Sequence, residues 1–494
     1  MKPEDLNPVS HTVTRDSEDR RDAFRLPSVL LLASVAIVVI GAGLRLYASW
    51  DDFWLDEIWS WRFAIAANSY WQIATQMRHD NNQIFNTWII YSLPSDVHWA
   101  IYRFPAVLAG VGTVVLAGLC GMRRSPCECI TALLLSSGSF VFIQYSSEAR
   151  GYAYLLFFTM FCVWMMERFV ARPCARDEWL FGIGASLGFL SHFLFAAAYV
   201  GFLAWSLVSV LGIHRGLSAR VLCLLRLHAL PFLTIAGLAL SYGGQPMTGG
   251  GERQRLLDVL IQAGSLAVGG PDGGRLAELS CCGAVLATIA GMILLIRRGD
   301  GIFYFVAGST ITLALMIWIA KPEAIYMRHF LIPVASITLV LGHVLAQVWR
   351  FGIWGRMLYV VVMGAVLAGN GVHTWRLLAT GRGGYQAAVD FMQAESKLPE
   401  ITVASDHDFR NSMVLNYYYG RLKDPKPLIH FPHGRWPAEA PEWLILHSFQ
   451  QPPQPLPMIL DGAGNRYRLT RVYPYSGLSG WNWMLYHRVN LDEV

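Results

Sequence analysis

Long apolar runs, separated by short polar loops, recur along the chain from Leu26 to about Val372. A helix that crosses a bilayer needs about 20 residues, and most of these runs approach that length. We count about eleven of them, at 26–44, 104–122, 130–145, 152–166, 179–193, 195–212, 227–242, 279–296, 302–320, 330–348 and 358–372. This pattern predicts a polytopic α-helical membrane domain.

Arginine-rich loops fall on one side of this predicted bundle. If the N-terminus lies inside, every short basic loop also lies inside, as the positive-inside rule requires. These loops contain Arg123, Arg124, Arg168, Arg172, Arg176, Arg215, Arg220, Arg226, Arg297, Arg298, Arg350 and Arg356. We therefore expect a cytoplasmic N-terminal tail at 1–25 and a transmembrane domain at 26–374, with a large first outer loop at 45–103. The expected location is the inner (plasma) membrane of a bacterium.

The pattern changes beyond about Trp375, where prolines and charges return and no further span-length run occurs. Within 375–494, apolar residues at helical spacing predict a helix at Tyr385–Glu395. Short alternating runs predict strands at Ile401–Ala404, Trp443–His447, Tyr467–Val472 and Trp483–Arg488. We expect a small extracytoplasmic α/β domain at the C-terminus.

Three further stretches have helical spacing but are too short or too polar to cross a membrane. Two lie in the first outer loop, at 70–77 and 85–91, and one at 252–267. Such segments are expected to lie along the membrane surface.

Composition supports membrane insertion and excludes an ordinary soluble protein. The chain is 54% hydrophobic and 15% charged, whereas soluble domains are near 25% charged. All eight cysteines fall in predicted spans or inner loops, and their spacing does not suit zinc. The outer domain therefore has no disulfide framework.

Polar side chains with chemical potential gather on the predicted outer face. Asp56 and Glu57 follow the first span, and His192 lies at a break in an apolar run. The other candidates are His79, Asp80, Asn82, Arg103, Glu148, Arg150, Tyr152 and Arg328. Each has a simpler structural interpretation as a loop residue, helix cap or turn residue. Their convergence on one face nevertheless favours a site, because acids at a membrane boundary are costly and usually functional.

These residue types suit a reaction on an anionic, lipid-linked substrate. Arginine binds phosphate oxygens through charge-assisted hydrogen bonds, and a carboxylate can act as a general base. No glycine-rich nucleotide-binding loop occurs on the inner face. The free energy for the reaction must then come with the substrate.

Four motifs resemble those of GT-C membrane glycosyltransferases, in the family 39-like branch that includes protein O-mannosyltransferases and aminoarabinose lipid A transferases. They are Leu55-Asp56-Glu57, Arg103-Phe104-Pro105, the junction Tyr145–Tyr152 and Arg328–Pro333. The resemblance implies a polyprenyl-phosphate sugar donor and inversion at the anomeric carbon. It also implies an extracytoplasmic lipid, glycan or protein acceptor.

The resemblance also implies roles for individual residues. Asp56 matches the family's catalytic carboxylate, with Glu57 as its motif partner. Arg150 and Arg328 match arginines of the second and late motifs, and we expect Arg150 first, then Arg328, with Arg103, to bind the donor phosphate. Glu148 and Tyr152 match the family's second motif, and we expect them to bind substrate together with His79, Asp80, Asn82 and His192 of the outer-face cluster. Many relatives have His-Pro-Pro in the first loop, where this chain has His79-Asp80-Asn81.

Several alternatives stay open at the level of the sequence. Asp56 and Glu57 with His79, Asp80 or His192 offer ligands for a divalent metal. A transporter or lipid flippase is the main rival function, although its path needs ionisable residues within several spans. A third reading is an assembly partner that binds through tail aromatics such as Trp443. Nothing indicates a nucleic-acid partner.

Overall fold

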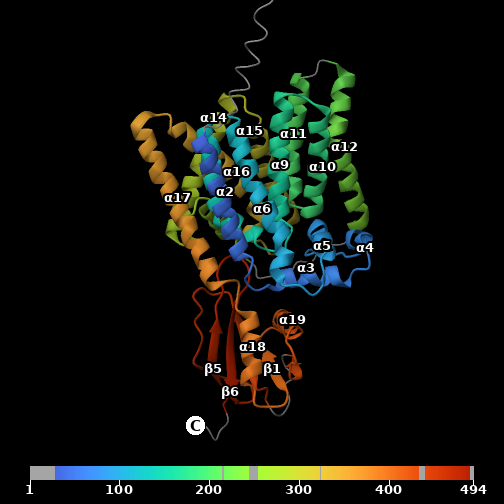
Figure 1. Ribbon diagram of the computed structural model, residues 1–494, viewed down its shortest axis with the longest axis vertical. Coiled ribbons are helices and arrows are strands. Elements are labelled where there is room, and N and C mark those ends of the chain that lie inside the picture. Colours follow the sequence, from blue (N-terminus) through green and yellow to red (C-terminus); the bar gives the residue numbers. More distant parts are fainter. Residues whose placement is uncertain (1–27, 214–215, 244–253, 323, 433–439, 490–494) are drawn as a thin grey trace, which may run out of the picture.

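The computed structural model describes residues 28–213, 216–243, 254–322, 324–432 and 440–489. Figure 1 shows a bundle of long helices with a smaller part, built around a β-sheet, at one end of it. We call this smaller part the sheet domain (Tyr385–Arg488). The predicted tail at 1–25 lies outside the described residues.

Each of the eleven predicted segments lies on the helical bundle, which confirms the predicted fold class. Nine helices in the described ranges are long and apolar enough to cross a membrane, and one bent pair makes a tenth span. The remaining segment, α10, has 17 residues. The helices are α2 (Ser28–Ala48), α6 (Trp99–Met122), the bent pair α7 (Pro126–Gly138) and α8 (Phe140–Ser146), α9 (Tyr152–Ala171), α10 (Ala175–Ser191), α11 (Phe195–Ile213), α12 (Leu217–Tyr242), α14 (Arg275–Arg297), α15 (Ile302–Ala320), α16 (Leu331–Val348) and α17 (Gly352–Thr380). The chain is therefore a multi-pass membrane protein.

The bent pair has a local cause at Ser139. α7 and α8 meet at an angle of 58°, and the Ser139 hydroxyl accepts a hydrogen bond from the Phe142 N–H at 3.3 Å. Asn370 of α17 accepts the Phe140 N–H at 2.8 Å. Such caps satisfy the backbone groups that a helix break leaves without partners. After the bend, α8 ends at Ser146, directly before the polar junction 147–151.

The short helices of the predicted first outer loop lie at the sheet-domain end of the bundle (Figure 1). They are α3 (Leu55–Ala66), α4 (Tyr70–Thr75) and α5 (Ile84–Tyr91). α4 and α5 occur where the sequence predicts helices, as does α13 (Leu256–Ala267), whereas α3 was not predicted. Asp56 and Glu57 occupy the first turn of α3, where the helix dipole favours carboxylates.

The sheet domain has two helices and one six-stranded mixed sheet. The strand order is β2-β1-β3-β6-β5-β4, with parallel pairing around β1 and antiparallel pairing from β3 onward. The elements are α18 (Tyr385–Glu395), β1 (Ile401–Ser405), α19 (Asp408–Tyr419), β2 (Leu428–Phe431), β3 (Trp443–Ser448), β4 (Met458–Leu460), β5 (Arg466–Tyr473) and β6 (Asn482–Arg488). The predicted helix and all four predicted strands are present, while α19, β2 and β4 are additional.

Arg382 fixes the sheet domain to the bundle. Its guanidinium is fully buried and donates to the Ala48 carbonyl at 3.1 Å and the Ser147 hydroxyl at 2.8 Å. It also forms an ion pair with Asp51 at 3.3 Å. Gly381 adopts a φ of 75°, and a Cβ there would lie 2.3 Å from an Asp51 oxygen. Glycine is therefore required where the chain passes from α17 into the sheet domain.

Asp52 makes this junction sensitive to pH. Its carboxylate accepts the Gln386 N–H at 2.8 Å, and burial, helped by the charge of Asp51, raises the pKa of Asp52 to about 7 from 3.8. Because the pKa of Asp52 is raised in the folded state, its contribution to the free energy of unfolding is complete below about pH 4. This contribution is lost as the pH rises through 7. We therefore expect the melting temperature of Asp52→Asn, relative to that of the wild type, to rise as the pH increases from 5 to 8. A constant difference across that range would contradict this account.

Candidate active site

Asp56 lies at the centre of a charged cluster formed by three distant segments. One carboxylate oxygen, Oδ2, is 3.2 Å from Arg150 Nη1 and 3.2 Å from Arg328 Nη1. The other, Oδ1, accepts a hydrogen bond from Asn81 Nδ2 at 3.3 Å. Three predicted site residues therefore meet at one point, together with Asn81, whose role the sequence did not indicate.

Arg150 is the buried cation of this cluster. It is 2% exposed, and its Nη1 also donates to Asn81 Oδ1 at 2.7 Å. Burial disfavours the charge of Arg150, but Asp56, together with Tyr152 and Glu148, offsets this and raises the pKa of Arg150 above the usual value. The guanidinium lies 5.4 Å from the centroid of the Tyr152 ring. Arg150 therefore remains charged within a nearly dry site.

Arg328 is the accessible cation. It lies in the short helix η1 (Met327–Phe330), before α16, and its side chain is 21% exposed. Two guanidinium groups thus share one carboxylate, and the cluster has an excess positive charge. An excess of this kind attracts an anion, and arginine geometry suits phosphate oxygens.

The cluster opens into a cleft of about 450 Å³ between the bundle and the sheet domain. Asp56, Arg328 and Tyr145 line the cleft from the bundle. Arg410, Phe449 and Trp481 line it from the sheet domain. Asp56 therefore has access to a space large enough for sugar-sized groups.

Glu57 and Arg103 form a separate, fully buried pair. Arg103 donates to the Glu57 carboxylate through Nε at 2.7 Å and Nη2 at 2.5 Å, and both side chains are 0% exposed. Other Arg103 N–H groups donate to the carbonyls of Ser49 and Asp52. The Ala149 N–H donates to Glu57 at 2.7 Å. The geometry thus gives Arg103 a structural position, with its donors already used, and not one that suits donor phosphate.

Breaking this pair is expected to destabilise the protein strongly. Glu57→Ala leaves Arg103 as an uncompensated buried charge, for which we expect a loss of about 3–5 kcal/mol in the free energy of unfolding. Unfolding by denaturing detergent in mixed micelles measures the loss. The double variant Glu57→Leu/Arg103→Met removes both charges and is expected to recover part of the loss, because the carbonyls of Ser49 and Asp52 and the Ala149 N–H lose their partners. A double variant as unstable as the single one would refute this role.

Glu148 is also buried within the fold rather than exposed in the cleft. It is 0% exposed; its Oε1 accepts from Gln144 Nε2 at 2.7 Å and faces Arg382 Nε at 3.4 Å. Arg382 comes from the start of the sheet domain and was not predicted as a site residue. Its signal in the sequence is only an arginine between two glycines, Gly381 and Gly383.

Three of the remaining predicted residues, Asp80, Asn82 and His192, line a second cavity of about 340 Å³. Residues of α10 and α12 complete its mostly apolar lining. The Nδ1 of His79 is 2.7 Å from Asp80. Burial opposes the charge of Asp80, but His79, with Arg150 beyond it, lowers the pKa of Asp80 below its usual value. Asn82 donates to the carbonyls of two first-loop residues, both at 2.8 Å.

An aromatic row separates the cleft from this second cavity. The His192 ring lies 4.8 Å from that of Tyr152, which lies 5.2 Å from that of Tyr145. His192 is 5% exposed, and burial, helped by nearby cations, lowers its pKa well below the usual value. Neutral His192 therefore does not add to the positive charge of the cluster.

The side chains around Asp56 do not suit a divalent metal. Within the described ranges, no group of three or more His, Cys, Asp or Glu side chains is arranged to hold an ion. The oxygens of Asp56 face two guanidinium groups and an amide N–H. Beyond Asp56 itself, this donor set offers none of the further carboxylate oxygens that Mg²⁺ or Ca²⁺ favours.

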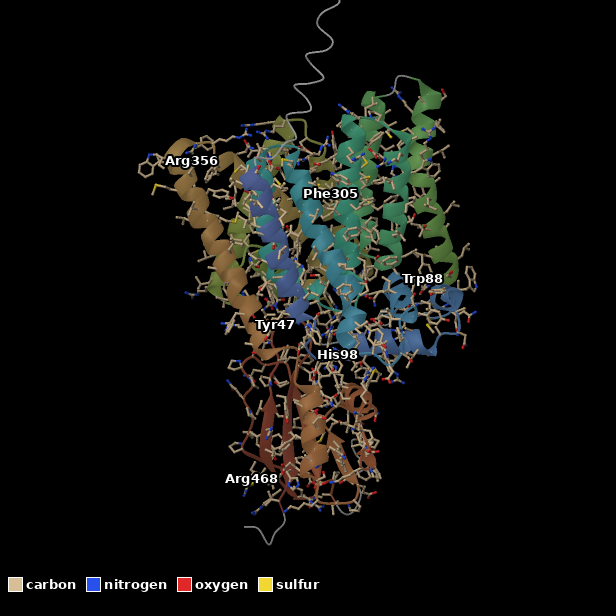
Figure 2. The ribbon with its side chains drawn as sticks, viewed as in Figure 1. Tyr47, Trp88, His98, Phe305, Arg356 and Arg468 are labelled. Carbon is tan, nitrogen blue, oxygen red and sulfur yellow. The ribbon has the colours of Figure 1, made fainter. Side chains whose placement is uncertain are left out.

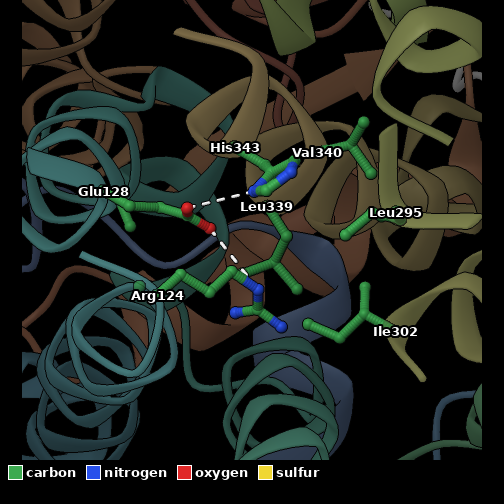
Figure 3. A pocket seen from close by; sticks show the side chains of 9 residues that line it. Arg124, Glu128, Leu295, Ile302, Leu339, Val340 and His343 are labelled. Atoms are coloured by element: carbon green, nitrogen blue, oxygen red, sulfur yellow. Dashed lines mark hydrogen bonds and ion pairs between the residues drawn. The ribbon is translucent and has the colours of Figure 1, made fainter. Parts of the chain in front are cut away.

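A further polar cluster lies where α6 ends and α7 begins, and it has a structural character. Figure 3 shows this cluster from close by. Its cavity is only about 10 Å³, the size of one water molecule. Glu128 accepts from His343 at 3.0 Å and lies 3.7 Å from Arg124. Arg124 also pairs with Asp300 at 2.7 Å. This network joins the ends of α6, α7, α15 and α16.

The bundle and sheet domain together have the fold seen in a crystal structure of ArnT. Over 92% of its length, the chain is similar to the crystal structure of ArnT, an aminoarabinose transferase, from Cupriavidus metallidurans bound to undecaprenyl phosphate. That match covers 98% of ArnT, with a TM-score of 0.50 and 11% identity. ArnT in the apo state gives a TM-score of 0.49 at 11% identity over 92% of this chain and 97% of that one. An Archaeoglobus fulgidus oligosaccharyltransferase gives 0.44 at 13% identity, over 81% of this chain and 59% of that one.

At these identities the likeness concerns the fold alone. No family model and no curated protein matches the sequence.

Proposed function

We propose that this protein transfers a sugar from a polyprenyl-phosphate donor to an extracytoplasmic lipid, glycan or protein acceptor. The observation that supports this most strongly is the position of Asp56 between Arg150 and Arg328, at the mouth of the cleft. A carboxylate paired with an excess of positive charge suits an anionic substrate. The GT-C fold and its solved example with undecaprenyl phosphate agree with such a donor.

In this proposal the donor phosphate takes the place of Asp56 on the two arginines. Arg328 and Arg150 bind the phosphate oxygens through charge-assisted hydrogen bonds. The Asp56 carboxylate, released from its ion pairs, then faces the acceptor hydroxyl in the cleft. Binding of the donor therefore prepares the base for the reaction.

The transfer itself is a single displacement at the anomeric carbon. The acceptor oxygen forms a bond to this carbon while the bond from the carbon to the phosphate oxygen breaks. Asp56 accepts the hydroxyl proton as a general base. Polyprenyl phosphate leaves with the electron pair, stabilised by Arg150 and Arg328. Attack opposite to the leaving group inverts the configuration of the sugar.

The other predicted residues support this site in different ways. The Glu57–Arg103 and Glu148–Arg382 pairs position α3 and the junction 147–151. The second cavity, bordered by Asp80, Asn82 and His192, has an apolar lining that suits part of the prenyl chain. His79 holds Asp80, and Tyr152 lies between this cavity and Arg150.

The proposed orientation places the sheet domain outside the cell. Arg356 lies at the end of the bundle opposite the sheet domain (Figure 2), and the positive-inside rule assigns that end to the cytoplasm. The cleft then faces the outer surface of a bacterial inner (plasma) membrane.

The function is tested with the purified protein, a panel of radiolabelled polyprenyl-phosphate sugars, and a membrane extract as acceptor. Label that moves from one donor into a new product supports the proposal. If no donor gives a product while the protein moves labelled lipid or solute across vesicle membranes, the flippase or transporter alternative holds instead.

A further inference from the structure

The sheet domain contributes its own cation to the cleft. Arg410, in the first turn of α19, lines the cleft from the side opposite the bundle. Among the described residues, it forms no ion pair with a carboxylate. Its guanidinium lies 5.1 Å from the centroid of the Phe449 ring, which also lines the cleft. A cation at a cleft wall that no carboxylate contacts directly is suited to bind an anion.

A hydrogen-bonded chain holds Arg410 in place. Arg410 Nη1 donates to His447 Nε2 at 3.2 Å, and His447 Nδ1 is 2.9 Å from Asp406 Oδ1. Because His447 Nδ1 donates to the carboxylate, its Nε2 is free to accept from the arginine. Asp406 also accepts from Asn411 at 2.9 Å and from the His447 N–H at 3.0 Å. The charge of Arg410 is therefore preorganised rather than freely solvated.

Two indole N–H groups at the cleft lack partners. Trp481 of the sheet domain is 2% exposed, and Trp54, before α3, is 7% exposed. Both line the cleft, and neither Nε1 has a hydrogen-bond partner among the described residues. A buried donor without a partner costs about 1–3 kcal/mol. A ligand with oxygen acceptors that reaches either donor would remove this cost.

The aromatic rings complete the features of a sugar-binding surface. Phe449 is 37% exposed, and its ring centroid lies 6.2 Å from that of Trp481. Aromatic faces bind the apolar faces of sugar rings, while indole N–H and guanidinium groups bind their oxygens. A neutral ligand would leave the charge of Arg410 unused.

We infer that Arg410, Phe449 and Trp481 form a subsite for an anionic sugar of the acceptor, one that bears a phosphate or a carboxylate. This inference rests on the proposed transferase function. The donor phosphate is tied to a lipid chain and so belongs with Arg150 and Arg328 on the bundle. Arg410 lies on the other wall of the same cleft, so it contacts the second substrate. Asp56 lies in the same cleft as this subsite, as a base for the acceptor hydroxyl requires.

Binding of small sugars to the full-length protein tests the subsite independently of transfer. The protein is placed in nanodiscs and saturated with polyprenyl phosphate, and the dissociation constants of glucose 6-phosphate, glucuronate and glucose are measured. We expect at least one anionic sugar to bind more tightly than glucose by about 10-fold or more, the value of a charged hydrogen bond. The tighter of the two identifies phosphate or carboxylate as the recognised group.

Variants assign this binding to the sheet domain. Arg410→Gln is expected to reduce the affinity of the anionic sugar to that of glucose. Arg468→Gln, an exposed arginine on β5 of the same domain (Figure 2), is the matched control and should change nothing. Trp481→Phe keeps the ring but removes the N–H, and is expected to weaken binding about 2- to 10-fold. Melting temperatures of all three variants verify that they fold.

Two results would overturn the subsite. One is anionic-sugar affinity that Arg410→Gln leaves unchanged. The other is binding that polyprenyl phosphate abolishes, because the anion then occupies the donor site. If the transferase proposal itself is wrong, the result is a different one: the transfer assay gives no product from any donor.

Discussion

Asp56→Asn is expected to lower the rate of sugar transfer by about 10²–10⁴-fold, the usual contribution of a general base. Asparagine has nearly the same shape, so the contacts of Asn81 and the two arginines are kept in outline. It cannot accept the proton of the acceptor hydroxyl. Because the charge that competes with the donor phosphate is removed, we expect polyprenyl phosphate to bind at least as tightly as it does to the wild type.

Steady-state transfer and equilibrium binding of labelled polyprenyl phosphate measure these two effects separately. The matched control is Asp258→Asn, since this side chain on α13 is 61% exposed and is not among the residues that line the cleft. It should transfer sugar at the wild-type rate. Near-normal transfer by Asp56→Asn would remove the proposed base from the mechanism.

Arg328→Gln is expected to weaken polyprenyl-phosphate binding by roughly 10- to 150-fold, corresponding to about 1.5–3 kcal/mol for a hydrogen bond to a charged group. Arg328 suits this test better than Arg150 because its side chain is 21% exposed, against 2% for Arg150. Its replacement therefore perturbs the fold less. The same variant leaves Asp56 with only Arg150 as its cationic partner.

The dissociation constant of polyprenyl phosphate measures this effect, with Arg356→Gln as the control at the opposite end of the bundle (Figure 2). The account expects Arg328→Gln and Asp56→Asn to differ in their effect on this constant. Arg328→Gln raises it, while Asp56→Asn leaves it unchanged or lowers it. An Arg328→Gln protein that binds polyprenyl phosphate like the wild type would refute the phosphate site.

The sequence predicted the membrane bundle well because bilayer insertion imposes a strong, local signal. Each predicted span needed only its own apolar residues, and even the bent pair α7–α8 was found as one segment, 130–145. The bend itself was not predicted, because its cap involves Asn370, far away in the sequence. In the sheet domain, the buried central strands were found. The short strand β4 was missed because it has only three residues.

The sequence predicted which residues belong to the candidate site, but not which of these residues contact one another. Residue types at the outer face identified Asp56, Arg150 and Arg328, which the structure brings together. The sequence did not indicate that the adjacent side chains of Asp56 and Glu57 lie in different surroundings. Asp56 lines the cleft, whereas Glu57 is fully buried. That division depends on which face of α3 meets Arg103, 46 residues later. Arg382 and Arg410 were missed because their partners come from other parts of the chain.

A structure of the full-length protein with polyprenyl phosphate tests the central claim most directly. The account predicts the phosphate between the guanidinium groups of Arg150 and Arg328, with the Asp56 carboxylate released from both and directed into the cleft. A phosphate bound elsewhere, with both Asp56 ion pairs intact, would contradict it.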